Sequence, residues 1–169
     1  MQIQTPAGTL ILINEPVYSF GSADNSRQYP IELLLDDEYS PSSVHGILLD
    51  GNPLVVLGDA GGCTGVHKHS VVLYNEAVYV AVGRHVTKLV LFPFSVAWSL
   101  QVDDATCFGV HANVERNALL SHGELGICRF SEIGEILWSV LGADIFSEGF
   151  SLHQDHVEAV DFNHNIYKF

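Results

Sequence analysis

The stretch GEILWSV at residues 134–140 has an earlier counterpart, SVAWSLQ, at residues 95–101. Both place a Trp-Ser pair in an apolar run of the kind that favours β-strands, and the two pairs are forty positions apart. An acidic turn follows each stretch, and then a similar phrase, FGVH at residues 108–111 or GFSLH at residues 149–153. Recurrence at this period is typical of repeat proteins, in which one unit buries its apolar face by stacking on its neighbours.

Short apolar runs separated by turn residues predict about sixteen short antiparallel strands in one all-β domain, residues 1–169. No window shows sustained helical periodicity. The repeat units are expected at about residues 15–62, 63–106, 107–148 and 149–169, the last completed by residues 1–14. Pairing of the N-terminal strand, residues 9–14, with residues 165–169 would close a ring and hide the sheet edges. The aromatic side chains of Trp98 and Trp138 are expected to be buried at equivalent places.

The sequences IGEILWS at residues 133–139 and VEAVDFNHNIYKF at residues 157–169 resemble a β-propeller repeat of the quinoprotein type. WD40 repeats are similar in rhythm but carry Trp-Asp in place of Trp-Ser. The resemblance is best over residues 95–169 and implies a small four-bladed β-propeller-like ring. A β-sandwich built from similar hairpins is the alternative. The resemblance implies no function, and the ligands of a quinone site are not present.

Composition narrows the classes of partner. The net charge is −13, with seven Lys and Arg residues, so the chain is expected to bind neither nucleic acid nor an anionic membrane surface. The charge serves solubility, or it attracts a basic protein. An odd number of cysteines without a CxxC pair argues against a disulfide framework, and no signal-peptide or membrane-span pattern occurs, so a cytoplasmic location is expected. The cysteines are Cys63, Cys107 and Cys128.

Three histidines, His67, His111 and His153, occupy equivalent points in successive units. An acidic residue precedes each by eight or nine positions; these residues are Asp59, Asp103 and Asp144. In a propeller the three imidazoles would converge on the central channel, where they could bind Zn²⁺. The alternative, which we favour, is a structural latch in which each histidine bonds the preceding acidic turn and has a raised pKa.

Other candidate sites are weaker. The pairs His67 with His69 and His153 with His156 are interpreted as surface histidines. A cysteine four positions before His67 and another before His111 are interpreted as inert thiols, because a catalytic dyad has no reason to repeat. No nucleophile elbow, Walker loop or dinucleotide-binding fingerprint is present.

Two functional hypotheses remain. The first is a non-enzymatic protein-binding module, of an immunity or scaffold type, that presents an acidic surface to a basic protein partner and has no cofactor. The second is a small metal-dependent hydrolase that uses the channel histidines with Zn²⁺.

Overall fold

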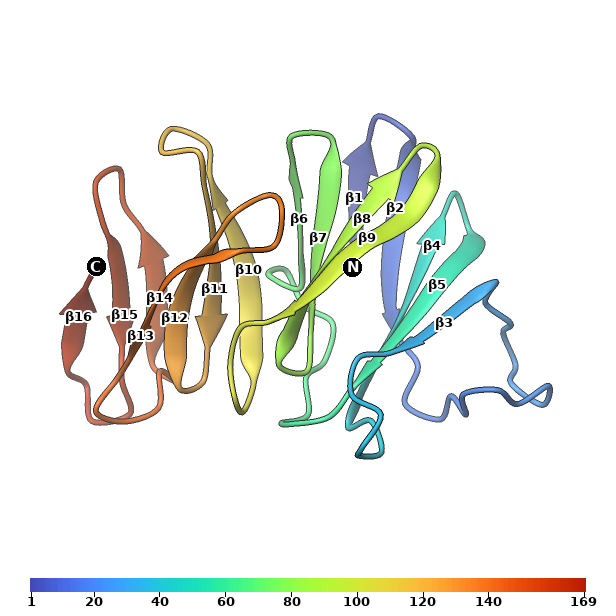
Figure 1. The fold of residues 1–169 in the computed structure, drawn as a ribbon, viewed down its shortest axis with the longest axis horizontal. Coiled ribbons are helices and arrows are strands. Elements are labelled where there is room, and N and C mark those ends of the chain that lie inside the picture. Colours follow the sequence, from blue (N-terminus) through green and yellow to red (C-terminus); the bar gives the residue numbers. More distant parts are fainter.

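The computed structural model describes residues 1–169 and contains sixteen β-strands and no helix. The strands form four sheets that follow one another in chain order across the molecule (Figure 1). The expected all-β class and the number of strands are confirmed.

The first sheet has the strand order β1-β2-β4-β5-β3. Its strands are β1 (Gln2–Thr5), β2 (Gly8–Asn14), β3 (Ile31–Leu34), β4 (Ser43–Leu49) and β5 (Asn52–Asp59). The second sheet contains β6 (Val71–Tyr74), β7 (Ala77–Val82), β8 (His85–Leu91) and β9 (Phe94–Gln101). The third contains β10 (Cys107–Asn113), β11 (Ala118–Gly123), β12 (Gly126–Phe130) and β13 (Ile136–Leu141). The fourth has only three strands, β14 (Gly149–Leu152), β15 (Val157–Val160) and β16 (Ile166–Lys168).

One strand pair of the first sheet is parallel. β3 runs parallel to β5, with Ile31 beside Val55, whereas the other strand pairs are antiparallel hairpins or neighbours. A parallel pair needs a long connection between its strands, and here that connection includes β4. The expectation of a purely antiparallel fold is therefore wrong at this sheet edge.

The N-terminal strand does not close a ring, so that expectation is wrong as well. β2 lies between β1 and β4, where Leu12 is opposite Ile47, and β16 pairs with β15 alone. The cause is local packing, because Leu10 and Leu12 are completely buried beside Ile47, against the second sheet. A β-sandwich is not observed either, since four sheets are present.

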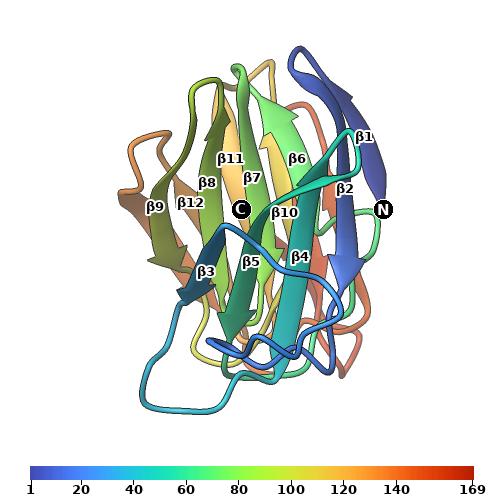
Figure 2. The same cartoon turned by 90° about the vertical axis from the view of Figure 1, so that its right-hand side faces the viewer.

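Residues 17–20 are a short apolar run of the kind that the sequence pattern counts as a strand, but they are part of a loop that covers the outer face of the first sheet (Figure 2). Tyr18 and Phe20 pack there with Tyr29 and the buried Val56. Gly46 permits this contact, because a Cβ at that position would overlap the hydroxyl of Tyr29. β1, a short strand at the sheet edge whose residues are alternately exposed and half-buried, replaces residues 17–20 in the strand count.

The fourth sheet, at the other end of the row, presents a polar outer face. Ser151, Glu158 and Lys168 lie opposite one another across its three strands on that face. On the inner face, Val157 and Ala159 are buried against the third sheet. An open row of sheets is stable when its terminal units are covered or polar on the outside, and both ends meet this condition.

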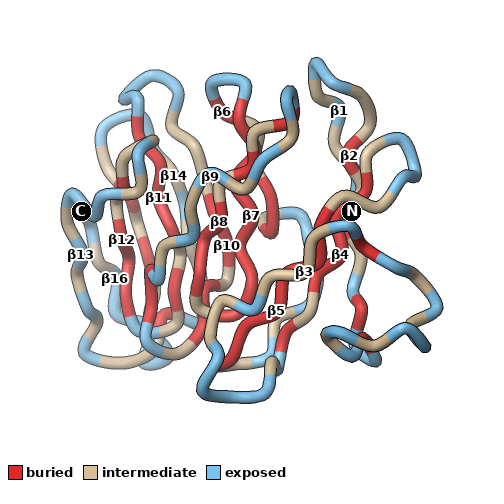
Figure 3. Tube along the Cα trace, turned by 45° about the vertical axis from the view of Figure 1, so that its right-hand side comes forward, coloured by how far each residue is buried: buried red, intermediate tan, exposed pale blue.

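Three hydrophobic clusters join the sheets in consecutive pairs. Aliphatic side chains, among them Ile47, fill the junction between the first and second sheets. The aromatic rings of Tyr79 and Phe130 fill the junction between the second and third sheets. Phe146 is fully buried at the third junction. Figure 3 shows that buried residues follow the middle strands of the sheets, whereas the turns are exposed.

A repeated aspartate also links each sheet to the next. Asp59, the last residue of β5, accepts hydrogen bonds from the amide of Arg84 at 2.7 Å and from Nδ1 of His85 at 2.8 Å. Asp103 accepts from the amides of Leu125 and Gly126, both at 3.0 Å. Asp144 follows the same pattern and accepts from Nδ2 of Asn163 at 2.6 Å.

Each aspartate therefore binds the turn between the second and third strands of the following sheet. The expected latch, in which the aspartates would bond His67, His111 and His153, is wrong. Asp59 and Asp103 accept from main-chain amides of these turns, which need a hydrogen-bond partner when buried, whereas Asp144 accepts from the side-chain amide of Asn163.

Trp98 and Trp138 occupy equivalent positions, as expected, opposite Lys88 and Arg129 on the neighbouring strands. Both indoles are half-buried rather than fully buried. Nε1 of Trp98 donates to the carbonyl oxygen of Glu132 in the next sheet, at 3.1 Å.

Candidate functional site

Histidine and phenylalanine rings form a row that runs from the segment before β6, across β10 and β11, to β14. His69 lies 4.7 Å from His111, which lies 4.3 Å from Phe150, and Phe150 stacks on His122 at 4.8 Å between ring centroids. His67 and Phe108 extend the two ends, at 6.0 Å from His69 and 5.4 Å from His122. We call these six residues the histidine–aromatic row.

Burial favours the neutral form of three imidazoles of this row, those of His69, His111 and His122. It lowers the pKa of His111 to about 3, with a further contribution from the neighbouring His69 and His122. The pKa values of His69 and His122 are lowered for the same reason. The expectation of a raised pKa is thus wrong at His111, because burial rather than a carboxylate determines its charge. We interpret the contacts between these rings as packing contacts between neighbouring sheets.

His153 does not lie in this row. It is at the turn between β14 and β15, where its ring stacks on His156 at 4.4 Å with an interplanar angle of 7°. The chain contains one group of three potential ligands whose donor atoms all lie close together, and His67 and His111 do not belong to it. In the structure, His69 lies between His67 and His111 and contacts both. His153, the third residue of the predicted metal site, does not join them.

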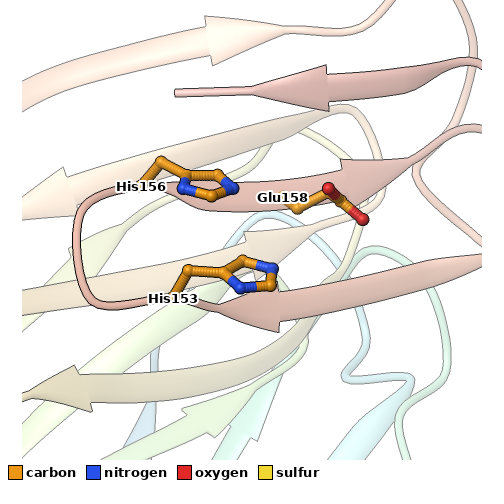
Figure 4. Close-up of side chains that lie close together, drawn as sticks. All are labelled: His153, His156 and Glu158. Atoms are coloured by element: carbon orange, nitrogen blue, oxygen red, sulfur yellow. The ribbon is translucent and has the colours of Figure 1, made fainter.

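The group that does converge consists of His153, His156 and Glu158, whose ligand atoms lie within 4.8 Å of one another (Figure 4). Two imidazoles and one carboxylate are a frequent protein ligand set for Zn²⁺. The two-residue turn between the histidines brings their rings together, and Glu158 follows two positions later on β15.

A neighbouring carboxylate orients one of these rings. Nδ1 of His156 lies 2.8 Å from Oδ1 of Asp155, and this hydrogen bond lowers the pKa of Asp155. The other ring nitrogen, Nε2, is buried without a hydrogen-bond partner. A carboxylate on one nitrogen and a free second nitrogen are the arrangement that metal-binding histidines need. The sequence HQDHVE at residues 153–158 carried this signal, although the pair was interpreted as surface histidines.

The two buried cysteines offer no second reactive site. Burial raises the pKa of Cys107 to about 12 and that of Cys128 to about 11, which agrees with inert thiols. Cys63 is exposed and also unpaired.

Acidic residues occur in the turns at one end of the sheets, and these turns are at the lower end of the ribbon in Figure 1. Main-chain hydrogen bonds connect these turns, from Gly62 to Ala105, from Glu124 to Thr106 and from Phe146 to Glu124. We define the acidic rim by six residues that are exposed or half-buried there: Asp37, Glu38, Asp104, Glu124, Asp144 and Glu148. The nearby Arg84 forms an ion pair with Asp36.

No family model matches the chain, and no curated protein matches it. Among solved structures, the chain is similar to BamB from Moraxella catarrhalis, with 7% sequence identity and a TM-score of 0.32. The match covers 75% of this chain and 53% of that one, so the chain spans about half the length of that protein. The structure contains no helix, and therefore no helix long and apolar enough to cross a membrane.

Proposed function

We propose that the chain is a non-enzymatic protein-binding module whose acidic rim contacts a basic protein partner. The observation that supports this is the continuity of the rim, whose six carboxylates lie on the β3–β4 connection, the β9–β10 connection, the β11–β12 turn and the β13–β14 connection. A surface of one charge attracts an oppositely charged partner and speeds its association. An immunity-type or a scaffold protein would use such a surface.

Several of the chain's few cationic side chains do not neutralise the acidic rim, because they are already paired with other carboxylates. Arg27 pairs with Glu15, Arg84 with Asp36 and Lys168 with Glu158. The rim carboxylates have no such partners among the ion pairs of the structure, so their charge is available to another molecule.

The test is capture of partners from the native host with two variants of equal charge. The rim variant carries Asp37→Asn, Glu38→Gln, Asp104→Asn and Glu124→Gln. The control carries four neutralising substitutions elsewhere on the surface, Asp24→Asn, Glu76→Gln, Glu115→Gln and Glu135→Gln. We expect a basic protein that the wild type and the control retain and that the rim variant loses. Equal retention by both variants, or partners without basic character, would contradict the proposal.

The convergence of His153, His156 and Glu158 supports a second candidate function, a metal-dependent hydrolase that binds Zn²⁺ at these residues. Three protein ligands leave a fourth position of Zn²⁺ free for water, which the metal can activate as a nucleophile. This site replaces the channel histidines as the proposed location of the metal.

Titration calorimetry with Zn²⁺ tests this candidate. We expect one ion per chain, and loss of binding in His153→Gln and in His156→Gln, but not in the control His164→Asn. Hydrolysis of a chromogenic ester or phosphoester that requires Zn²⁺ and His156 would support an enzyme. Binding without hydrolysis would leave a metal-binding module, and absence of Zn²⁺ binding would exclude the site.

A further inference from the structure

A cavity of about 360 Å³ lies between the third and fourth sheets, away from the acidic rim. It is bounded by the β10–β11 turn, the faces of β11, β12 and β13, the start of β15 and the C-terminal residue. The side chains that matter for its chemistry are Arg116, Arg129, Trp138, Asn113, His156 and Phe169. Small-molecule sites in proteins commonly begin at about 300 Å³, so the cavity has room for a small ligand.

Two of the seven cationic side chains in this acidic protein line the cavity, and neither forms an ion pair. Arg116 donates from Nε to the carbonyl oxygen of Gln154 at 2.9 Å. Arg129 is half-buried, and its Nε is buried without a hydrogen-bond partner. An unpaired, half-buried guanidinium is unexpected in a protein with a net charge of −13, because buried cations are normally paired.

The equivalent position in the second sheet shows what such a cation usually contacts. Lys88 lies opposite Trp98, just as Arg129 lies opposite Trp138. Nζ of Lys88 and Nε1 of Trp98 both donate to the carbonyl oxygen of Glu132, at 2.8 and 3.1 Å. An acceptor oxygen from the adjacent sheet thus satisfies the cation–indole pair at that junction.

We propose that the cavity binds a small molecule that carries an oxyanion, either a carboxylate or a phosphate. The guanidinium of Arg129 binds the oxyanion, Arg116 adds a second cation, and the rings of Trp138 and Phe169, 6.3 Å apart, contact the body of the ligand. Arginine binds both oxyanions through two parallel N–H···O bonds. Asp155, the one acidic side chain of the lining, is hydrogen-bonded to His156.

The probes for the test are inorganic phosphate, benzoate and phenyl phosphate, titrated into the full chain by calorimetry. Benzoate and phenyl phosphate separate a carboxylate site from a phosphate site, and inorganic phosphate reports the contribution of the aromatic walls. We expect one of the aromatic probes to bind at least several-fold more tightly than inorganic phosphate.

Substitutions assign the binding to the two arginines. Arg129→Gln should weaken binding of the preferred probe by about tenfold or more, since it removes a charged donor, and Arg116→Gln by several-fold. The control Lys168→Gln removes the same charge from the outer face of the fourth sheet and should change the affinity by less than about twofold.

Two further measurements keep the proposal falsifiable. If Arg129→Gln does not fold, Arg129→Lys retains the charge but loses the two-pronged geometry, and it should still weaken binding by several-fold. The proposal is wrong if the wild type binds none of the three probes at millimolar concentration. It is also wrong if Arg116→Gln and Arg129→Lys both bind as the wild type does.

Discussion

Asp59 bonds His85 across the junction between the first and second sheets, with its Oδ2 2.8 Å from Nδ1 of the imidazole. The same oxygen accepts from the amide of Arg84, and the other oxygen accepts from the amide of Ala60. The side chain of Asp59 is completely buried, so it has no water to replace these donors. The carboxylate is thereby a required part of the junction.

Asp59→Asn should destabilise the protein by about 2–4 kcal/mol, because the amide group would place N–H donors against two N–H donors of the turn. Urea unfolding followed by circular dichroism measures this loss. Asp104→Asn, an exposed neutralisation at the next junction, is the control and should change stability by less than about 0.5 kcal/mol. Equal effects of the two substitutions would show that charge, not hydrogen bonding, matters.

The histidine–aromatic row predicts sensitivity to acid. Folded His111 stays neutral down to about pH 3, whereas in the unfolded chain it takes up a proton near pH 6.5. The unfolded state therefore binds more protons in this window, and stability should fall as the pH drops from 6.5 towards 3, by at most about 5 kcal/mol for this group. Above pH 6.5 its contribution is complete.

His111→Phe tests this dependence, because it keeps a ring beside Phe150 and removes the titrating nitrogen. The unfolding free energy of the variant should depend less steeply on pH between 4 and 7 than that of the wild type. His164→Asn, at an exposed turn, should leave the dependence unchanged. A variant with the wild-type slope would mean that other groups cause the acid sensitivity.

Gly46→Ala should detach the loop that covers the first sheet. The added methyl group would overlap the hydroxyl of Tyr29, which donates to Glu15 at 2.7 Å. We expect a loss of about 1–3 kcal/mol, as in other overpacked sites, and faster proteolysis within residues 15–30. Gly65→Ala is the control, since its Cβ would meet no atom closer than 4.0 Å.

Trp98→Ala should cost more stability than Trp138→Ala. Trp98 packs on Tyr79 and Phe130 and bonds the carbonyl of Glu132, so its loss should approach about 3 kcal/mol. Trp138 contacts Phe169 beside the cavity, where part of its surface is already open. Chemical denaturation of both variants measures the difference. A larger loss of stability in Trp138→Ala would contradict the prediction that Trp98 contributes more to the fold.

The all-β class and the strand count followed from the sequence because hairpin patterns are local. The position of β2 could not be predicted in the same way. Leu10 and Leu12 would suit the edge of either terminal sheet, and the choice depends on Ile47, far away in the chain. The covering role of Tyr18 and Phe20 was hidden for a similar reason, since a short aromatic run suits a strand as well as a covering loop.

The sites were predictable only in part. Equivalent positions of His67, His111 and His153 suggested convergence, but residues at the same point of stacked sheets need not share one axis when the sheets form an open row. His153 and His156 approach each other through a two-residue turn instead. The cavity beside Arg129 had no sequence signal, because what distinguishes this arginine is the absence of an ion-pair partner, which only packing reveals.

The open row of sheets affects how the molecule comes apart. Each hydrophobic cluster joins two consecutive sheets, so the second and third sheets have neighbours on both sides, while the fourth has one. Amide hydrogens of β14–β16 should therefore exchange through local fraying at a lower free energy than those of β7 or β11. His153 and the cavity beside Arg129 both lie at this end. A molecule bound at either place would slow that fraying and would be detected first as protection of the last sheet.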